Sequence, residues 1–460
     1  MNEKNKETPL KQALQTAVMT MLAALATLAC SVALDAEAGP AILGVVLCLS
    51  LSRSQLDLDR RGRIEAAVAL PAVSLSALGV GLLLHDYFWI GAAAFVAAIM
   101  LSIWLRRFGA EGRKAGSLIA LPFVVILVTP HVPATKVSHL MALALPIVVA
   151  LLALFWVSLF HAGGRLLGWL PEPEPKAVPA PAAPRGEGKT LLVSTRMTFQ
   201  MGLALAVSFA VGYAFFAQHW AWVVLTAFIV GSGNQGRLDV VYKSVLRVGG
   251  AGLGTVSALA LAGHFGGHDA TTVGSILAAV FLGVWLRPLG YAWWALFVTL
   301  ALALLQGFEG ASMEAILWPR VLGIAVGALI GVACAWFVLP VHSTDVMRRR
   351  LADALAAMGE AFDPAQTERK PDRFVAQMAA VQRVAPAFRA ARLVTRRWRS
   401  LQPAEWADQL QACRQPALEL IAKGETPGAV RKAIGEARKS MREPQAIGPA
   451  LAALRKSLGG

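Results

Sequence analysis

Long apolar runs separated by short charged loops divide this sequence, and few folds are compatible with that pattern. The chain has 460 residues, of which 56% are hydrophobic and only 15% are charged. A soluble protein usually carries about 25% charged residues, whereas a helix needs about 20 apolar residues to cross the hydrocarbon core of a bilayer. The pattern therefore predicts an all-α polytopic membrane protein embedded in a lipid bilayer.

Twelve apolar runs are candidate transmembrane helices. They lie near residues 12–34, 38–52, 64–84, 88–105, 115–130 and 137–160 in the first half, and near 194–216, 219–233, 245–265, 270–286, 290–307 and 317–340 in the second. The runs at 38–52 and 115–130 are the weakest, so ten crossing helices are the alternative to twelve. The first run is interpreted as a retained helix, although Ala36–Ala38 faintly resembles the cleavage site of a signal peptide.

The two halves of this hydrophobic region resemble each other. LSIWLRRFG at residues 101–109 and LGVWLRPLG at 282–290 lie 181 positions apart and agree at five of nine positions, which include Arg106 and Arg287. Repeated units in a membrane protein commonly enclose a substrate path at their interface. The sequence predicts two six-helix repeats, parallel because each has an even number of spans. It also favours transport as the function.

Lys and Arg gather in alternate loops, which indicates how the chain is oriented in the membrane. Basic clusters begin at Arg53, Arg106 and Arg237, and the tail from Ser343 holds 21 Lys and Arg against 12 Asp and Glu. The loops between them are nearly devoid of Lys and Arg. The positive-inside rule therefore predicts that both termini are cytoplasmic. The net charge of +15 is interpreted as topology rather than as nucleic-acid binding.

Four regions follow from these patterns. Residues 1–170 are expected to form the first transmembrane repeat and residues 191–342 the second. Residues 171–190 are a Pro/Ala-rich linker that is too short for a domain. Residues 343–460 carry amphipathic patterns broken by prolines, which predict a small basic helical cytosolic domain. Its run ARLVTRRWRS, residues 391–400, is interpreted as a solvated helix face rather than as a contact for anionic lipids.

No enzyme motif occurs in the sequence. Walker A, GxSxG, HExxH and paired CxxC patterns are all missing, and the four cysteines are scattered. The protein is therefore not expected to be an enzyme, and neither a metal nor another cofactor is expected. Transport without a nucleotide-binding domain would be secondary, driven by a proton or ion gradient, or would need no coupling.

Candidate substrate-binding residues lie at the end of the second span of the second half. This segment, GSGNQGRLD at residues 231–239, combines glycines whose backbone amides can hold an anion with the hydrogen-bonding side chains of Asn234 and Gln235. Arg237 adds positive charge, although a solvated charge in a cytoplasmic turn is the simpler interpretation. Asp239 is a titratable acid and a candidate for proton coupling.

Two arginines and a histidine complete the set of candidate residues. Arg247 stands at the start of an apolar span, where an unpaired charge is costly, and is predicted to bind the substrate. Arg320 enters the last span from the outer side, where it attracts an anionic substrate or instead pairs with Glu314 or Glu309. His219 titrates near neutral pH and is the second candidate for proton coupling.

Glycines on two spans predict close packing of helices. Gly250 and Gly254 lie one helical turn apart, and so do Gly323 and Gly327, so each pair shares one face of its helix. Small residues in such stripes let two membrane helices approach closely. These four residues are therefore predicted to pack helices rather than to bind substrate.

The order of these residues resembles that in a known family. HWAWVVLTAFIV at 219–230, RVGGAGLGT at 247–255 and WPRVLGIAVGALIG at 318–331 are similar to the second membrane unit of the fusaric acid resistance family. This family of inner-membrane exporters includes aromatic carboxylic acid efflux proteins. The resemblance is strongest over 194–342 and weaker over 12–161. Longer relatives carry a large cytosolic insert between the membrane units, where this chain has only its linker.

The resemblance implies a bacterial inner-membrane exporter of small organic, often aromatic, carboxylates. It further implies a periplasmic membrane-fusion adaptor as a partner, and a homo-oligomer is a further expectation. A passive organic-anion channel is one alternative, since plant malate channels are distantly similar. A non-transporting scaffold of an envelope complex, acting through the basic tail, is another.

Overall fold

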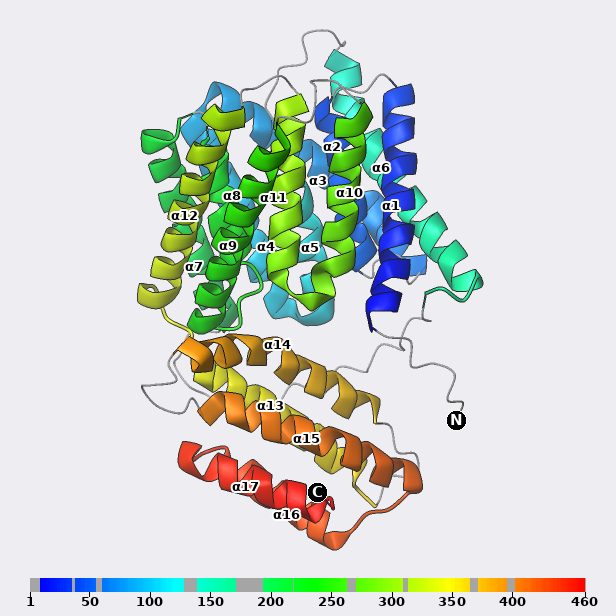
Figure 1. Ribbon diagram of the computed structural model, residues 1–460, viewed down its shortest axis with the longest axis vertical. Helices are drawn as coiled ribbons and strands as arrows, with labels where there is room; N and C mark the ends of the chain where they lie inside the picture. The colour runs from blue at the N-terminus through cyan, green and yellow to red at the C-terminus, as the bar shows by residue number, and fades with distance from the viewer. Residues whose placement is uncertain are drawn as a thin grey trace. The chain divides into compact units, whose positions relative to one another are not determined.

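All regular structure in the described part of the chain is helical (Figure 1). The computed structural model describes residues 9–34, 38–54, 60–127, 139–170, 193–217, 219–262, 270–308, 313–364, 371–394 and 402–459. Its contacts divide these residues into two units. The first holds the described residues up to Ser232 together with Lys243–Leu339, and the second holds Gly233–Tyr242 and Pro340–Gly460. The predicted linker at 171–190 lies outside the described residues.

Each predicted apolar run corresponds to one helix, within eight residues at either end, and the largest difference is at the start of α9. These helices are α1 (Pro9–Ala33), α2 (Ala38–Ser54), α3 (Arg60–Asp86), α4 (Phe88–Leu105), α5 (Gly109–Ile126), α6 (His139–Leu166), α7 (Val193–Phe215), α8 (Trp220–Gly231), α9 (Arg237–Ala262), α10 (Ala270–Leu286), α11 (Tyr291–Phe308) and α12 (Met313–Phe337). The agreement follows from the length of the runs, because an apolar segment can satisfy its backbone groups in a bilayer only by forming a helix or a closed barrel.

Eight of the described helices are long and apolar enough to cross a membrane, namely α1, α3, α4, α6, α7, α9, α10 and α12. The helices α2, α8 and α11 are apolar but shorter. The first two turns of α5 carry Glu111, Arg113 and Lys114, which lower its hydropathy. The crossing of the membrane by all twelve helices therefore stays a prediction. The two weakest predicted spans, α2 and α5, are among the four helices that fall short.

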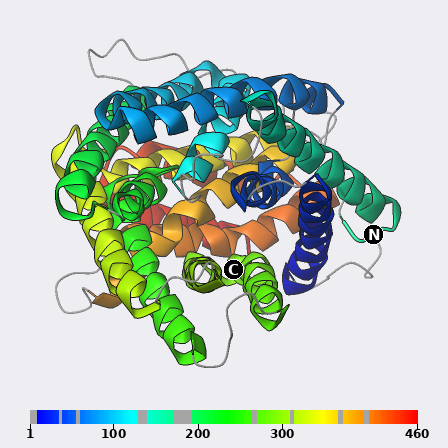
Figure 2. The same ribbon diagram turned by 90° about the horizontal axis from the view of Figure 1, so that it is seen from above.

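The contacts among the first six helices recur among the next six. In the first half α1, α2 and α6 pack on one another, and α7, α8 and α12 do so at the corresponding places in the second. Between the halves, α4 packs against α7, and α1 packs against α10 beside it (Figure 2). Adding 181 to the residue numbers of α4 gives approximately those of α10, and subtracting 181 from those of α7 gives approximately those of α1. The repeat therefore relates these two interfaces to each other. This correspondence favours the proposed repeat, whose arrangement in a membrane stays a prediction.

The two copies of the repeated motif adopt the same kind of corner. A 3₁₀ turn, η2 (Arg106–Phe108), follows α4, and another, η3 (Arg287–Leu289), follows α10. Each turn is followed by a glycine with positive φ, 84° at Gly109 and 155° at Gly290. L-residues with a Cβ rarely adopt such angles, which explains why both copies of the motif end in glycine.

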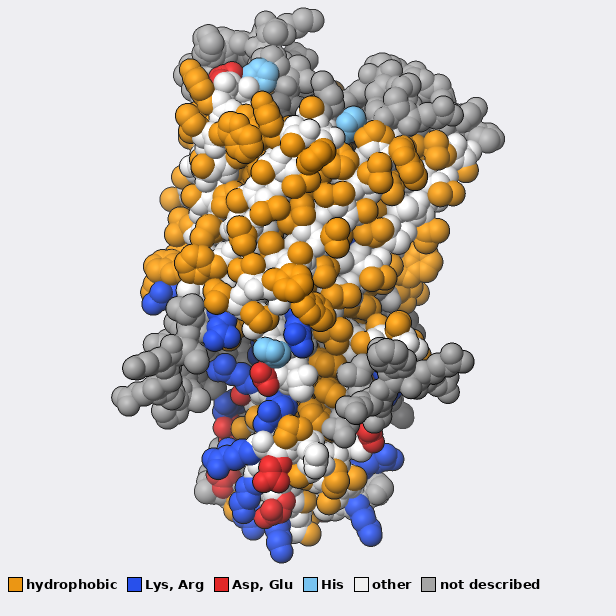
Figure 3. Space-filling model, turned by 90° about the vertical axis from the view of Figure 1, so that its left-hand side faces the viewer, with side chains coloured by type: hydrophobic (Ala, Val, Ile, Leu, Met, Phe, Trp, Pro, Cys, Tyr) orange, Lys and Arg blue, Asp and Glu red, His pale blue; other side chains and the backbone are white. Residues whose placement is uncertain are grey.

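Large apolar side chains cover the outside of the first unit (Figure 3). On α7 and α12 they include Phe199, Leu203, Leu322 and Leu329, all of which are exposed. Soluble proteins rarely expose continuous apolar patches larger than a few hundred Å². Such a surface is suited to hydrocarbon as its solvent, in agreement with a multi-pass membrane protein.

The second unit contains five further helices around its own core. These are α13 (Ser343–Ala361), α14 (Asp372–Val394), α15 (Gln402–Lys423), α16 (Gly428–Ser440) and α17 (Pro444–Ser457). Leu351, Phe374, Phe388 and Trp406 are almost completely buried in this core. The tail is therefore a helical unit, as its amphipathic patterns predict. Its location in the cytosol stays a prediction.

Loosening this core should expose Cys413 to alkylation. Burial raises the pKa of the Cys413 thiol to about 11, so only about one thiol in a thousand is ionised at pH 8. Phe388→Ala removes a ring that is 2% exposed and should lower the free energy of unfolding of this unit by about 3–5 kcal/mol. Alkylation of Cys413 in the full-length chain, followed by peptide mass spectrometry, should accelerate accordingly.

A matched control for this experiment lies on the same helix. The side chain of Val394 is 87% exposed, so Val394→Ala should leave the alkylation rate of Cys413 unchanged. Equal rates in the Phe388→Ala and Val394→Ala variants would show that the ring does not stabilise the core.

Candidate functional site

Close packing of α8 on α12 places Trp222 against Arg320. A Cβ added at Gly323 would lie 3.4 Å from the Cβ of Trp222, and one added at Gly327 would lie 2.3 Å from the carbonyl oxygen of Val223. The Arg320 side chain is 0% exposed, and its Cζ lies 3.9 Å from the centre of the Trp222 ring. The two glycines remove the bulk that would separate the helices. The guanidinium can therefore stack on the indole.

A second pair of helices, α9 and α11, packs in the same way near Arg247. Cβ atoms added at Gly250 and Gly254 would lie 2.7 and 2.5 Å from carbonyl oxygens of α11. Arg247 precedes Gly250 by about one turn and is 1% exposed. Its side chain lies beside the hydroxyl of Tyr291, the first residue of α11.

Arg247 and Arg320 come close enough for their like charges to repel each other. The helices of this half carry few acids. The helices α8, α10 and α11 contain none, α9 has only Asp239 and α12 has only Glu314. These acids stand eight and six residues from the arginine of their own helix, or about 12 and 9 Å along the axis. Two buried cations in such surroundings are costly, and a bound anion would offset that cost.

A third arginine extends the pair. The Tyr291 hydroxyl lies within electrostatic reach of both Arg247 and Arg287. Arg287 belongs to η3, and its Cζ lies 4.7 Å from the centre of the Trp294 ring. Arg287, Arg247 and Arg320 therefore form a series, which we call the arginine series, in which each member lies beside an aromatic side chain. An aromatic anion needs a positive charge for its carboxylate and a flat apolar surface for its ring. Each position in the arginine series offers both groups.

The arginine series lies within a segment that matches a known family. Residues 203–334 match the family model described as fusaric acid resistance protein-like. The match runs from α7 to α12 and confirms the resemblance seen in the sequence over this segment. The family is one of membrane transport proteins and not of enzymes, so the segment and its apolar helices indicate a multi-pass membrane transport protein. Among curated proteins, none matches the chain.

The fusaric acid resistance protein-like segment also contains the turn between α8 and α9, where four other candidate residues gather. The backbone N–H of Gln235 donates to the carboxylate of Asp239 at 2.9 Å. Asn234, the residue before Gln235, is buried. Asp239 stands in the first turn of α9, where a carboxylate offsets the unpaired N–H groups and the helix dipole. Asp239 therefore has a structural role at the start of α9, and its part in proton coupling stays a prediction. The backbone N–H of Arg237 donates to the carbonyl oxygen of Val341 at 3.0 Å.

The same turn groups with the second unit rather than with the membrane helices. The Leu238 N–H donates to the hydroxyl of Ser343 at 2.9 Å, and a Cβ added at Gly236 would lie 2.6 Å from that hydroxyl oxygen. Arg247, ten residues after the first residue of α9, belongs to the first unit. The structure therefore gives the predicted residues of this family-matched segment two places, one in the turn and one in the arginine series.

His219, the other candidate for proton coupling, immediately precedes α8. Its neighbour Trp220 has its ring centre 5.3 Å from that of Phe88 and 5.5 Å from that of Phe209. The carbonyl oxygen of His219 accepts a hydrogen bond from the Trp222 N–H at 3.1 Å. Burial lowers the pKa of the His219 imidazole below its ordinary value. The ring is therefore mostly neutral at pH 7 and takes up a proton only under acidic conditions.

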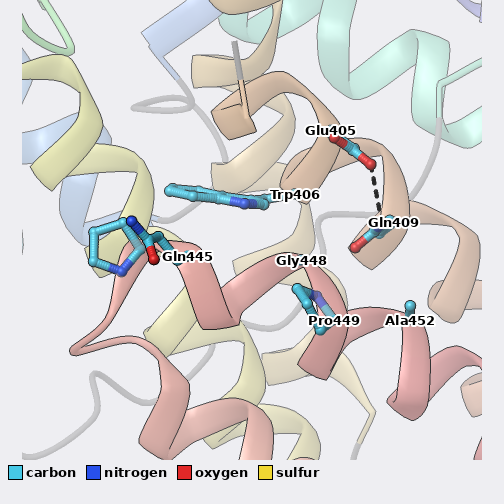
Figure 4. A pocket seen from close by; sticks show the side chains of 8 residues that line it. Glu405, Trp406, Gln409, Gln445, Gly448, Pro449 and Ala452 are labelled. Atoms are coloured by element: carbon cyan, nitrogen blue, oxygen red, sulfur yellow. Dashed lines mark hydrogen bonds between the residues drawn. The ribbon is translucent and has the colours of Figure 1, made fainter. Parts of the chain in front are cut away.

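A pocket outside the family-matched segment lies between α15 and α17 in the second unit (Figure 4). Its volume is about 270 Å³, and Glu405, Trp406, Gln409 and Pro449 are among the residues that line it. The Gln409 amide donates to the Glu405 carboxylate at 3.5 Å, while Trp406 belongs to the core. Its lining contains no cation, His or Cys. In the part of the chain that the structure describes, no three His, Cys, Asp or Glu side chains are grouped to hold a metal ion.

One arginine of the series and two aromatic residues beside it were not predicted from the sequence. Arg287 falls in the repeated motif, which predicts only the repeat, and Tyr291 and Trp294 fall just after it. The aromatic run YAWW at 291–294, directly after an arginine, is the signal that marks them. Its meaning depends on α9 packing against α11, which no local pattern shows.

Proposed function

We propose that the protein exports small organic carboxylates, in particular aromatic ones, across the bacterial inner membrane. The observation that carries this proposal is the pair of fully buried arginines, Arg247 and Arg320, in helices with almost no acids. A carboxylate balances their charge and accepts paired hydrogen bonds from a planar guanidinium. The indole of Trp222 offers an apolar surface to the ring of the substrate. The match to a transport family supports the same function.

Uptake of radiolabelled benzoate into inverted membrane vesicles tests this proposal. Vesicles that contain the protein should accumulate benzoate faster than vesicles without it, and the rate should fall when the proton gradient is dissipated. Uptake that follows the membrane potential alone would instead identify a passive anion channel. No uptake of benzoate or of related aromatic acids would contradict the export proposal. The periplasmic adaptor, which rests on the family resemblance, and the homo-oligomer are further proposals.

Proton coupling through His219 predicts a particular pH dependence. Because burial lowers the pKa of His219, the protonated form grows as the pH on its side of the membrane falls below about 6.5. Export measured with that side at pH 7.5, 6.5 and 5.5 should therefore rise toward low pH in the wild type. His219→Gln cannot take up a proton and should give a flat profile.

An exposed histidine provides the control for this experiment. His85 lies at the end of α3, and His85→Gln should keep the pH profile of the wild type. A profile that stays unchanged in His219→Gln would exclude His219 as the coupling group.

A further inference from the structure

A cavity lies on the seam between the two halves of the first unit, where α1 and α10 run side by side (Figure 2). It measures about 200 Å³ and is lined by residues of α1 and α2 from one half and of α10, η3 and α11 from the other. An apolar cavity of about 150 Å³ is enough to hold benzene. This seam cavity therefore has room for a single aromatic ring with a carboxylate.

The side chains that line the seam cavity favour an anion. Arg287 contributes a positive charge, and none of the lining residues is acidic. Ser52, in its wall, has a buried hydroxyl without a hydrogen-bond partner among the described residues. The hydroxyls of Thr16 and Thr20 already donate to carbonyl oxygens one turn earlier in α1. The wall therefore contains a guanidinium and an unsatisfied O–H donor, and both groups donate hydrogen bonds to a carboxylate, which only accepts them.

The aromatic part of a ligand also has a place in the seam cavity. Trp294 lines it together with the apolar side chains of Leu49 and Val284. The Cζ of Arg287 lies 4.7 Å from the Trp294 ring centre, so the charged group and the flat apolar surface are neighbours. An aromatic ring packs well against an indole, whereas a small inorganic anion gains nothing from it.

The seam cavity stands at one end of the arginine series. Arg287 follows α10 at the corner where the chain turns into α11 (Figure 1). Arg247 is ten residues into α9, a rise of about 15 Å. Arg320 is 17 residues before the end of α12 at Phe337, a rise of about 26 Å. Tyr291 lies within electrostatic reach of both Arg287 and Arg247, and Arg247 within reach of Arg320, so the arginine series connects the seam cavity to the two buried arginines.

We propose that the seam cavity is a second binding site for aromatic carboxylates, at which Arg287 and Ser52 bind the carboxylate and Trp294 contacts the ring. On the proposed function, it is the site that the substrate occupies on the cytoplasmic side before it reaches Arg247 and Arg320. This second part rests on the export proposal. Binding itself does not, because it can be measured on a protein that does not transport.

The other half of the chain supplies a matched control residue. The offset of 181 residues pairs Arg287 with Arg106, but it pairs Ser52 with Gly233, which has no hydroxyl. The groups of the seam cavity are therefore not repeated around Arg106. Arg106→Gln removes the same charge at an equivalent corner without touching the proposed site.

Binding of radiolabelled benzoate to the purified full-length protein in phosphatidylcholine nanodiscs tests the proposal. Loss of a charge-assisted pair of hydrogen bonds should weaken binding at this site about tenfold or more in Arg287→Gln. Ser52→Ala should weaken it about threefold, and Arg106→Gln should bind as the wild type does. In inverted vesicles, Arg287→Gln should raise the KM for benzoate by a similar factor at an unchanged maximal rate.

Several outcomes would overturn the proposal. One is wild-type affinity in a folded Arg287→Gln protein, checked by a monodisperse gel-filtration profile, and another is an equal loss in Arg106→Gln. If Arg287→Gln does not fold, Ser52→Ala decides alone. Displacement of benzoate by small amounts of phosphatidylglycerol would identify a lipid-headgroup site instead. Benzoate that binds but is never transported would contradict the export proposal and leave the seam cavity as a binding site.

Discussion

Arg320→Gln and Arg247→Gln should each lower the export of benzoate about a hundredfold or more while leaving the protein at least as stable as the wild type. The loss is expected because truncating one partner of a buried charge contact typically costs 2–5 kcal/mol of binding free energy. The stability is expected because the two cations repel each other in the unliganded protein. Removing one of them relieves that repulsion and the cost of burying its charge.

The two readouts separate a binding role from a structural one. Export is measured in inverted vesicles and the melting temperature on the solubilised protein, with and without benzoate. Benzoate should raise the melting temperature of the wild type, since a ligand that binds only the folded state stabilises it. It should raise that of either variant less, because only the seam cavity then remains to bind it. Arg107 is exposed and stacks on Trp104 at 4.9 Å, so Arg107→Gln is the control that keeps both properties. A large fall in melting temperature with export retained would assign the arginines to the fold.

Gly254→Leu should prevent α9 from packing on α11 and should strongly reduce the yield of folded protein. A Cβ at this position would lie 2.5 Å from the carbonyl oxygen of Leu296 and 3.0 Å from the Cβ of Thr299. Backbone cannot move aside as a flexible side chain can, so the cost should reach or exceed the 1–3 kcal/mol that is usual for overpacking. The measurements are the yield of monodisperse protein and its thermal unfolding transition.

Gly252 gives the matched control on the same helix. A Cβ added there would have no neighbour within 4 Å, so Gly252→Leu should fold in wild-type yield. If both variants fold equally well, the close approach of α9 and α11 does not stabilise the protein. A corresponding loss in Gly327→Leu, where the Cβ would lie 2.3 Å from the Val223 carbonyl oxygen, would extend the result to α8 and α12.

The helices could be predicted because their signals are local. A run of apolar residues specifies a helix wherever the surroundings are hydrocarbon. Glycines spaced one turn apart lie on one face of that helix and let a second helix approach closely. The corners at Arg106 and Arg287 followed from a motif of nine residues that repeats in sequence. The division into units was less accessible, because the turn at Gly233–Tyr242 groups with the second unit through contacts with a segment about a hundred residues away.

The candidate site was predictable only in part. Arg247 and Arg320 attract notice in the sequence because a charge inside an apolar run is costly unless it has a function. Asp239 is predicted to take part in proton coupling, which stays a prediction, while its hydrogen bond with the Gln235 N–H at the start of α9 depends on the conformation of the turn. Arg287 and Ser52 gave no comparable signal, since an arginine in a loop and a serine at a helix end are ordinary residues.

The sequence by itself determined the twelve apolar helices, the basic helical tail and the two arginines that stand within apolar segments. Only the tertiary structure decided that these arginines meet, since they lie 73 residues apart on helices whose distance depends on how their glycine faces pack. It also decided that Arg287, Ser52 and Trp294 surround one cavity, because helices from both halves of the chain form its walls. Hydropathy is a property of each segment, whereas a binding site is a property of the contacts between segments.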